Sequence, residues 1–544
     1  KAICIASLIG LTACEKTFDE LASNPNQQDV NGFYNTPQNI NKGVIGIYAY
    51  ITTPRAMGTA GRLQINRGDE SSDASDYGVP GQYSANLSSS WYTIVQPYSL
   101  FYTAASQACQ MIEEIPKVNF SNQQLKNAYL GEAYFLRAYT HWFLFLNFRN
   151  IPLMKELPSS AKDYKPQATP EEAWDFIISD LKRAKELLPE KGFWTGESVG
   201  RVTKGSAIAL LGKAYLYRSG IEHYYGHSNT TYYNEAAAEF NELILSGKYR
   251  LVADYNDNFK VATENNDESI FELQFLGDVT NTGFNPGLSN SGVWRDPRGY
   301  LPPTNKNANS SVIHDWVYNT FVNSKDASGH TDPRMFGTLI FDDTKSEINA
   351  RTGDEVRIFD NKTFREYYGA KGFGVAKAQA KKYKAACRKG IDWTLATRNP
   401  GDNFYMWNGR ANGLNQTEIR YADVLLMYAE AVVKGGTQGS LTALDAVNQV
   451  RARVGMPAVS TVDMDVIEHE RILELTQEGH RFFDLLRWGK VAQRFHELER
   501  TDPNFKKYSN SAYLGFQENK NEWLPLPVDE VEGNPHITRN NPGW

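Results

Sequence analysis

Two segments of the sequence place aromatic rings among carboxylates, amides and guanidinium groups, a mixture that suits the binding of sugars. They are residues 67–91 (RGDESSDASDYGVPGQYSANLSSSW) and residues 281–305 (NTGFNPGLSNSGVWRDPRGYLPPTN). A flat ring can cover the C–H face of a sugar, while Asn, Asp or Arg can bond its hydroxyl edge. The residues that we expect to contact such a ligand are Asp73, Asp76, Tyr77, Tyr83, Asn86, Trp294, Arg295, Asp296, Arg298 and Tyr300.

Trp294 is the best single candidate for a stacking platform, and Tyr77 and Tyr300 come next. The alternative for each ring is that it anchors its own loop against the core. Trp91 is different, because we expect it to begin a core helix.

Motifs of common enzyme classes are missing from the sequence. His469-Glu470 is followed by Arg471-Ile472-Leu473, so the zinc-protease pattern fails, and neither G-x-S-x-G nor a P-loop occurs. The four cysteines have no metal-ligand spacing, and we predict no metal and no cofactor. Carboxylates are plentiful, so a glycosidase pair stays open as the enzymatic alternative.

The composition also argues against nucleic-acid binding. The 544 residues carry 57 Lys and Arg against 63 Asp and Glu, a net charge of −6 without the basic excess that nucleic acid requires. Aromatic residues make up 12% of the chain, with 30 Tyr and 11 Trp, which leaves rings to spare for a binding surface.

The beginning of the sequence is typical of a lipoprotein signal. Lys1 precedes an apolar run, and Leu11-Thr12-Ala13-Cys14 resembles a bacterial lipobox. We therefore expect residues 1–13 to be the remnant of a signal peptide and Cys14 to carry the lipid anchor. No later segment reaches the roughly 20 apolar residues that span a bilayer. The alternative is a short core helix with a chance cysteine.

Helical periodicity recurs along the chain. It predicts a helix over residues 123–148 and another over 170–188, with Thr169 as its cap and Pro170 in its first turn. Two later helix pairs fit the tetratricopeptide pattern of small and large residues. Their diagnostic residues are Ile208, Leu211, Gly212 and Tyr215 with Ala236, Phe240 and Leu243, and Leu425, Tyr428 and Ala431 with Ala443, Val447 and Val450. Such pairs either present a protein-binding surface or pack as plain scaffold.

The sequence changes character between residues 251 and 415. Gly, Asn, Asp and Pro become dense, and short strand-like runs such as residues 269–275 appear. We expect a loop-rich excursion from the helical scaffold rather than a second domain. The basic run at residues 377–389 (KAQAKKYKAACRK) is expected to be one solvated helix face, or else a contact for an acidic partner.

Three C-terminal segments resemble the SusD/RagB family of outer-membrane lipoproteins. They are residues 419–431 (IRYADVLLMYAEA), 470–489 (ERILELTQEGHRFFDLLRWG) and 523–544 (WLPLPVDEVEGNPHITRNNPGW). The lipobox, Gly68-Asp69-Glu70 and Asp332-Pro333-Arg334 fit the same family, so the resemblance covers essentially the whole mature chain.

The resemblance implies a mostly α fold, with tetratricopeptide-type hairpins as scaffold and an irregular region carrying short strands. It implies a single body over residues 14–544, with scaffold at about 30–250 and 416–490, the excursion at about 251–415 and an extended segment at about 500–544. Members lie at the cell surface of the outer membrane, hold oligosaccharides or peptides for a SusC-like TonB-dependent transporter, and perform no chemistry. In the family, glycan contacts tend to come from the two segments described first.

Two alternatives remain within this family. The protein could bind peptides instead of glycans, or it could be a scaffold that docks on the transporter without a small ligand. The charged residues of 470–489 are expected to form a buried network, with a catalytic carboxylate pair as the alternative, and Glu430 is expected to pair with a neighbouring Arg.

Overall fold

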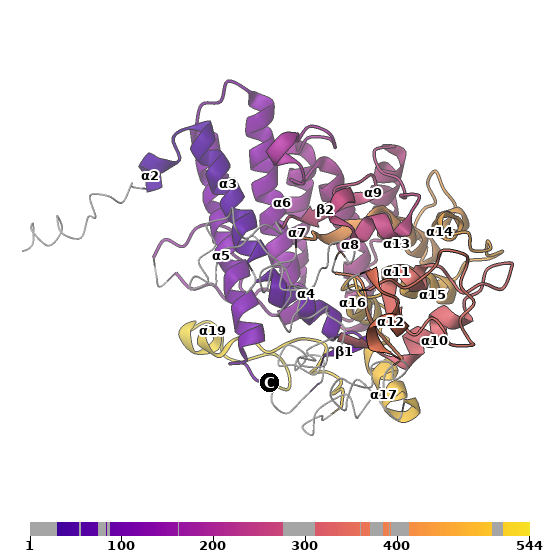
Figure 1. Cartoon of the computed structure of the whole chain (residues 1–544). Coiled ribbons are helices and arrows are strands. Elements are labelled where there is room, and N and C mark those ends of the chain that lie inside the picture. The colour runs from indigo at the N-terminus through magenta and orange to yellow at the C-terminus, as the bar shows by residue number, and fades with distance from the viewer. Residues whose placement is uncertain are drawn as a thin grey trace, which may run out of the picture.

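The computed structural model describes residues 30–53, 56–73, 83, 87–160, 163–275, 311–358, 361–369, 384–390, 392, 413–502 and 515–544. Helices account for most of the regular structure in these ranges, which confirms the predicted fold class (Figure 1). Within them, no helix has the length and apolar character to cross a membrane.

A row of long helices forms the scaffold, and each helix packs against the next (Figure 1). In order of contact they are α3 (Pro37–Thr52), α5 (Tyr92–Glu114), α6 (Gln123–Phe148), α7 (Pro170–Leu187), α8 (Lys204–Tyr224), α9 (Tyr233–Leu245), α13 (Tyr421–Val433) and α14 (Ala443–Arg453). One continuous hydrophobic core runs through the row.

The predicted helices at 123–148 and 170–188 are confirmed, and local chemistry explains their first residues. The Asn122 side chain accepts the Leu125 N–H at 3.1 Å at the start of α6. Thr169 and Glu172 cap each other's backbone N–H groups at the start of α7. These reciprocal bonds satisfy donors that have no partner within the helix. As expected, Trp91 directly precedes α5.

The two predicted tetratricopeptide-type pairs are also helix pairs in the structure, α8 with α9 and α13 with α14. A Cβ atom at Gly212 would lie 2.7 Å from the Phe240 ring, so the close approach of α8 and α9 needs glycine there. In the second pair, the Tyr428 hydroxyl donates to the Leu441 carbonyl at 2.6 Å and ties α13 to the turn before α14.

The other described helices lie outside this row. The α-helices are α2 (Val30–Phe33), α4 (Met57–Asn66), α10 (Asp315–Asn323), α11 (Arg334–Thr338), α12 (Phe364–Tyr368), α15 (Met464–Leu475), α16 (Arg481–Arg487), α17 (Val491–Thr501) and α19 (Val528–Gly533). The 3-10 turns are η2 (Ile115–Lys117), η3 (Gly196–Ser198), η4 (Tyr255–Phe259) and η5 (Val261–Thr263).

Two small antiparallel sheets lie beside the helices. One has the order β1 (Ser71–Asp73), β3 (Ser311–Ile313), β5 (Ala385–Cys387), β4 (Leu339–Phe341), and the other pairs β2 (Ser269–Leu273) with β6 (Gln416–Arg420). A second hydrophobic cluster lies around the four-stranded sheet and α10. The predicted strand at 269–275 is therefore confirmed as β2.

The expectation for the basic run at 377–389 was wrong where the structure describes it. Ala385–Cys387 form β5, a fully buried strand, rather than a solvated helix face. Lys389 is buried as well and pairs with Glu478 at 2.7 Å. The small residues near the end of the run fit between β3 and β4, and the ion pair with Glu478 accommodates Lys389.

The last residues of the chain fold back over the first scaffold helices (Figure 1). The Asn541 amide donates to the carbonyls of Phe148 and Leu524, both at 2.7 Å, and so joins the end of α6 to the C-terminal segment. The fully buried Arg67 donates to the carbonyls of Asn521 and Glu522 at 3.1 and 2.8 Å. Cys109 and Cys387 are both buried.

Candidate ligand-binding site

Most of the predicted contact residues lie outside the described part of the chain. These are Asp76, Tyr77, Asn86, Trp294, Arg295, Asp296, Arg298 and Tyr300, and Cys14 lies outside it too. Asp73 is the last residue of β1, and only its backbone is described. Of the first segment the structure describes residues 67–73, 83 and 87–91, and after the second segment the described chain resumes at Ser311.

Tyr83 is the one predicted contact residue whose side chain is placed, and it does not face solvent. Its ring is only 3% exposed and packs edge-on against Phe495 and Phe516, each at 5.0 Å between ring centroids. Its hydroxyl donates to the Arg67 carbonyl at 3.1 Å. The ring has no free face for a sugar, so we correct the expectation for Tyr83: it is a core residue of the first segment.

A strand within the first candidate segment pairs with the strand that follows the second. β1 pairs with β3 in antiparallel register, with Ser71 opposite Ile313 and Asp73 opposite Ser311. β1 lies inside the first segment, and β3 begins at Ser311, six positions after Asn305 ends the second. The structure therefore pairs Asp73 with Ser311, which are 238 positions apart in the sequence. We call the residues 69–73 and 311–316 the segment roots.

Asp69 lies at the centre of the segment roots. Its fully buried carboxylate accepts hydrogen bonds from Arg481 at 2.8 and 3.2 Å and from Arg494 at 2.7 Å. Its carbonyl accepts the indole N–H of Trp316 at 2.7 Å. Burial by itself would raise the pKa of Asp69, but Arg481 and Arg494 outweigh it and lower the pKa to about 2.

The pKa of the neighbouring Glu70 is shifted in the opposite direction. It is 2% exposed, and its carboxylate accepts the backbone N–H of Gln477 at 3.3 Å. Burial raises the pKa of Glu70 to about 8, and the negative charge of Asp69 adds to the rise against the opposing effect of Arg481. Two adjacent carboxyl groups thus differ in their charge at neutral pH.

A groove of about 370 Å³ lies next to the segment roots, where α10, α15 and α17 meet. Trp316 and Ile472 line it, and its walls carry both acidic and basic side chains, among them Glu468 and Lys490. The guanidinium carbon of Arg494 lies 4.4 Å from the centre of the Trp316 ring, which covers one face of the indole. The ring is therefore part of the framework of this groove.

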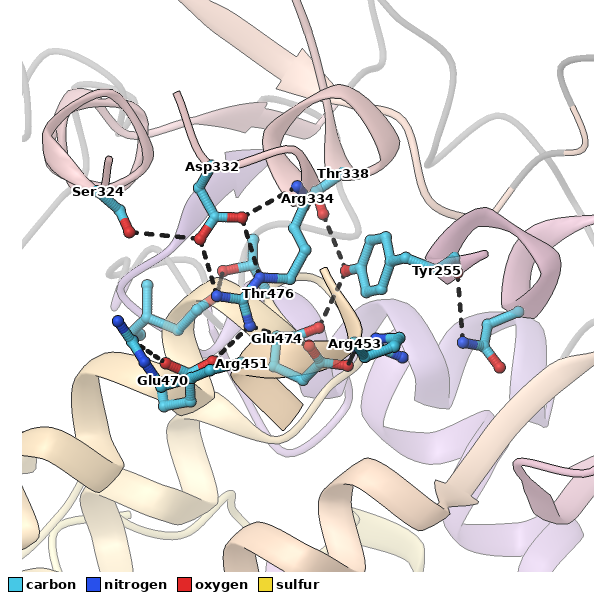
Figure 2. A network of polar contacts seen from close by, with 12 residues as sticks. Tyr255, Ser324, Asp332, Arg334, Thr338, Arg451, Arg453, Glu470, Glu474 and Thr476 are labelled. Carbon is cyan, nitrogen blue, oxygen red and sulfur yellow. Dashed lines mark hydrogen bonds and ion pairs between the residues drawn. The ribbon is translucent and has the colours of Figure 1, made fainter. Parts of the chain in front are cut away.

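A network of buried ion pairs lies between the loop-rich excursion (residues 251–415) and the helical scaffold (Figure 2). The fully buried Arg334 bonds Asp332 at 2.8 Å, Glu470 at 2.6 Å and Glu474 at 3.0 Å. Arg453 and the equally buried Arg420 also bond Glu474. Arg334 belongs to the excursion and Glu470 and Glu474 to α15, so these charges join the two parts.

The charged residues of 470–489 therefore form the buried network that we expected. Asp484 pairs with Arg471 at 2.7 Å, and Glu478 pairs with Arg420 at 2.7 Å. Burial would raise the pKa of Glu478, but Arg420 and Lys389 lower it to about 2. The pairing of Glu430 with a nearby Arg is confirmed as well, at 2.5 Å to Arg487. Carboxylates that are buried and bound by arginines in this way are poor candidates for acid–base catalysis.

The contacts that Asp69 makes with distant residues could not be predicted from the sequence. In the sequence, Gly68-Asp69-Glu70 only fits the family resemblance, and no local pattern distinguishes His314, Trp316 or Arg494. In the described part of the chain, no group of three or more His, Cys, Asp and Glu side chains is placed to hold a metal ion.

The described helices and sheets define a helical-repeat protein with a loop-bearing excursion. Residues 267–544 match the profile of the SusD family, and residues 20–216 match a profile described as starch-binding and associating with the outer membrane. The chain belongs to the SusD family.

Individual relatives agree with this assignment. The SusD-like protein P2 of Formosa agariphila is 25% identical over 548 residues, covering 94% of each chain. The crystal structure of a SusD superfamily protein from Bacteroides vulgatus superposes with a TM-score of 0.70 at 24% identity, covering 94% of this chain and all of that one. A laminarin-binding SusD-like protein has a TM-score of 0.69 at 23% identity, with the same coverage.

Proposed function

We propose that this protein captures an oligosaccharide at the surface of the outer membrane and delivers it, unchanged, to a SusC-like TonB-dependent transporter. The observation that carries the proposal is the match of residues 267–544 to the SusD family. The starch-binding, outer-membrane description of the profile over residues 20–216 and the laminarin-binding relative support a glycan ligand.

The two candidate segments would supply the contacts. Trp294 is the proposed stacking platform, with Tyr77 and Tyr300 beside it, and the acidic, amide and guanidinium side chains would bond the hydroxyl groups. The pairing of β1, which lies in the first segment, with β3, which follows the second, supports a single site that draws on both segments.

The expected affinity is modest. A stacked ring that loses roughly 60 Å² of apolar surface contributes about 1.5 kcal/mol, so two rings and a few hydrogen bonds give about 4–6 kcal/mol. That corresponds to a dissociation constant between about 1 mM and tens of micromolar. Such an affinity suffices for a protein that a lipid on Cys14 holds beside its transporter, since tethering raises the effective concentration.

A glycan screen tests the proposed ligand class. The chain from Glu15 onward is run in native gels that contain single polysaccharides of plant, host and microbial origin. Retardation by one structural class is the expected result. Oligopeptide binding without retardation by any glycan would favour the peptide-binding alternative, and copurification with the transporter without either ligand would favour the scaffold.

Fractionation of cells tests the proposed location. The wild-type protein should sediment with outer membranes and be accessible to protease added to intact cells. Cys14→Ala should release it from the membrane fraction, because no lipid is attached. Sedimentation of the Cys14→Ala protein with the membrane at wild-type levels would argue against the anchor.

A further inference from the structure

The groove between α10, α15 and α17 has the size of a site for a small ligand. Its volume of about 370 Å³ lies at the lower end of the range for small-molecule pockets, roughly 300–1,000 Å³. Each helix contributes to its lining: Trp316 and Thr320 come from α10, His469 from α15 and Gln493 from α17. The described residues that line the groove lie outside both candidate segments, 67–91 and 281–305.

The charged side chains of this groove already have partners of opposite charge. Among the described lining residues, three acidic side chains accompany three basic ones: Asp465, Glu468 and Glu497 with Arg481, Lys490 and Arg494. Lys490 and Arg481 both bond Glu468, at 2.6 and 2.8 Å. Arg494 bonds Glu497 at 3.1 Å. A charged ligand would have to compete with these pairs, whereas the hydroxyl groups of a neutral ligand can bond to ions that stay paired.

Two uncharged groups on different helices are available to a ligand. His469 and Gln493 are exposed, and within the described chain neither side chain has a hydrogen-bond partner. Partial burial lowers the pKa of His469, against the opposing effect of Glu470, so the ring is neutral at pH 7. A neutral imidazole and a carboxamide each have a donor and an acceptor, which matches the two roles of a hydroxyl group.

Trp316 gives the same groove an apolar wall. The indole lines the groove and is partly exposed, while Arg494 covers one of its faces from 4.4 Å. Its N–H donates to the Asp69 carbonyl at 2.7 Å, so the ring is held in place before a ligand arrives. An apolar ring beside groups that bond hydroxyls suits a sugar, which has a C–H face and a hydroxyl edge.

We propose that this groove is a second carbohydrate site, which holds a short stretch of a neutral glycan against Trp316 with hydrogen bonds to His469 and Gln493. The inference rests on the proposed function for its ligand class and differs in where the glycan binds. A polysaccharide that reaches both this groove and the site around Trp294 would be held at two points. Its affinity would rise, because the first contact increases the effective concentration for the second.

Amide hydrogen exchange locates the bound sugar. The chain from Glu15 onward is measured with maltohexaose, with laminarihexaose and with a hexasaccharide of the glycan that retards it in gels. An oligomer of galacturonic acid is the charged probe. We expect a neutral probe to slow exchange in peptides covering α15 and α17, and the charged probe to leave them unchanged. The same protection should persist in Trp294→Ala, because Trp294 lies in a different segment.

A double variant removes the two uncharged partners. His469→Ala/Gln493→Ala shortens two exposed side chains, so the fold should be kept, and melting temperatures check this. The matched control is His223→Ala/Gln38→Ala, which shortens an exposed histidine of α8 and an exposed glutamine of α3. The protection of α17 is titrated with the neutral probe. We expect the first variant to weaken binding about tenfold, the equivalent of two net hydrogen bonds, and the control to leave it unchanged.

The outcomes separate this inference from the proposed function. If a glycan binds the wild type but leaves α15 and α17 unprotected, the groove is not a carbohydrate site, while the proposed function stands. Equal titrations of the two double variants would overturn the role of His469 and Gln493. Protection by the charged probe in place of the neutral ones would overturn the ligand class. If no neutral glycan binds at all, the groove site and the proposed function fail together.

Discussion

Asp73 and Ser311 face each other across the antiparallel pair of β1 and β3. Asp73 belongs to the first segment that the sequence suggests as a sugar contact, and Ser311 follows the second. Two parts of the chain that are distant in sequence therefore pair in one sheet.

Arg334 is the centre of the ion network that joins the excursion to α15 (Figure 2). Arg334→Met should destabilise the protein by about 3–5 kcal/mol, because it leaves Asp332, Glu470 and Glu474 buried with one cation fewer. Urea unfolding measures the difference. The control is Arg183→Met, which breaks an exposed pair with Glu186 and should cost less than about 0.5 kcal/mol. Equal costs for both variants would mean that the buried network adds no stability.

Glu70 should make the folded protein less stable as the pH rises from about 5 to 8. Its pKa in the folded protein is about 8, above the value of 4.5 for a free Glu, so folding favours the protonated form. Glu70 therefore contributes most to the free energy of unfolding below about pH 4.5, and this contribution falls as the pH rises toward 8. Glu70→Gln should therefore gain stability relative to wild type between pH 5 and 8, by up to a few kcal/mol.

Unfolding free energies of wild type and Glu70→Gln at pH 5, 6.5 and 8 provide the measurement. Taking the difference between the two proteins removes the titration of all other groups. A difference that stays constant over this range would show that Glu70 ionises normally in the folded state. Arg481 and Lys389 are the cations that would have to stabilise its charge.

Gly220 should be intolerant of a single methyl group. A Cβ atom there would lie 2.3 Å from the Arg487 carbonyl oxygen, where α8 packs against α16. Gly220→Ala should cost about 2 kcal/mol or more, because backbone must move. Gly46 in α3 is the matched control, since its nearest neighbour, Gln107 Cγ, would lie at 3.9 Å. Gly46→Ala should gain about 0.5–1 kcal/mol from its helix propensity. Thermal unfolding of both variants compares them, and a loss for both would point to another cause.

Regular helices were the part of the fold that could be predicted from the sequence. The helices at 123–148 and 170–187 are long and periodic, and their capping residues Asn122 and Thr169 are local signals. β5 could not be predicted, because its three small residues lie in a lysine-rich run without hydrophobic periodicity. Their burial depends on β3 and β4, which lie elsewhere in the chain.

The framework of the site depends on contacts that no local pattern reveals. Asp69 and Arg481 are 412 positions apart, and Asp69 and His314 are 245 apart. The polar surroundings of Tyr83 in the sequence favour a ligand contact, yet its ring packs edge-on against Phe495 and Phe516. Composition identifies a segment as polar and aromatic, but it does not show which ring faces inward.

The central claim is that the protein binds a glycan through Trp294 and its neighbours, and one comparison tests it most directly. The dissociation constant for the glycan found in the screen is measured for wild type, Trp294→Phe and Trp294→Ala, with melting temperatures as the control for folding. We expect Trp294→Ala to weaken binding about tenfold, since a stacked ring contributes about 1.5 kcal/mol, and Trp294→Phe to retain part of the affinity. Wild-type affinity in a folded Trp294→Ala protein would contradict the assigned site.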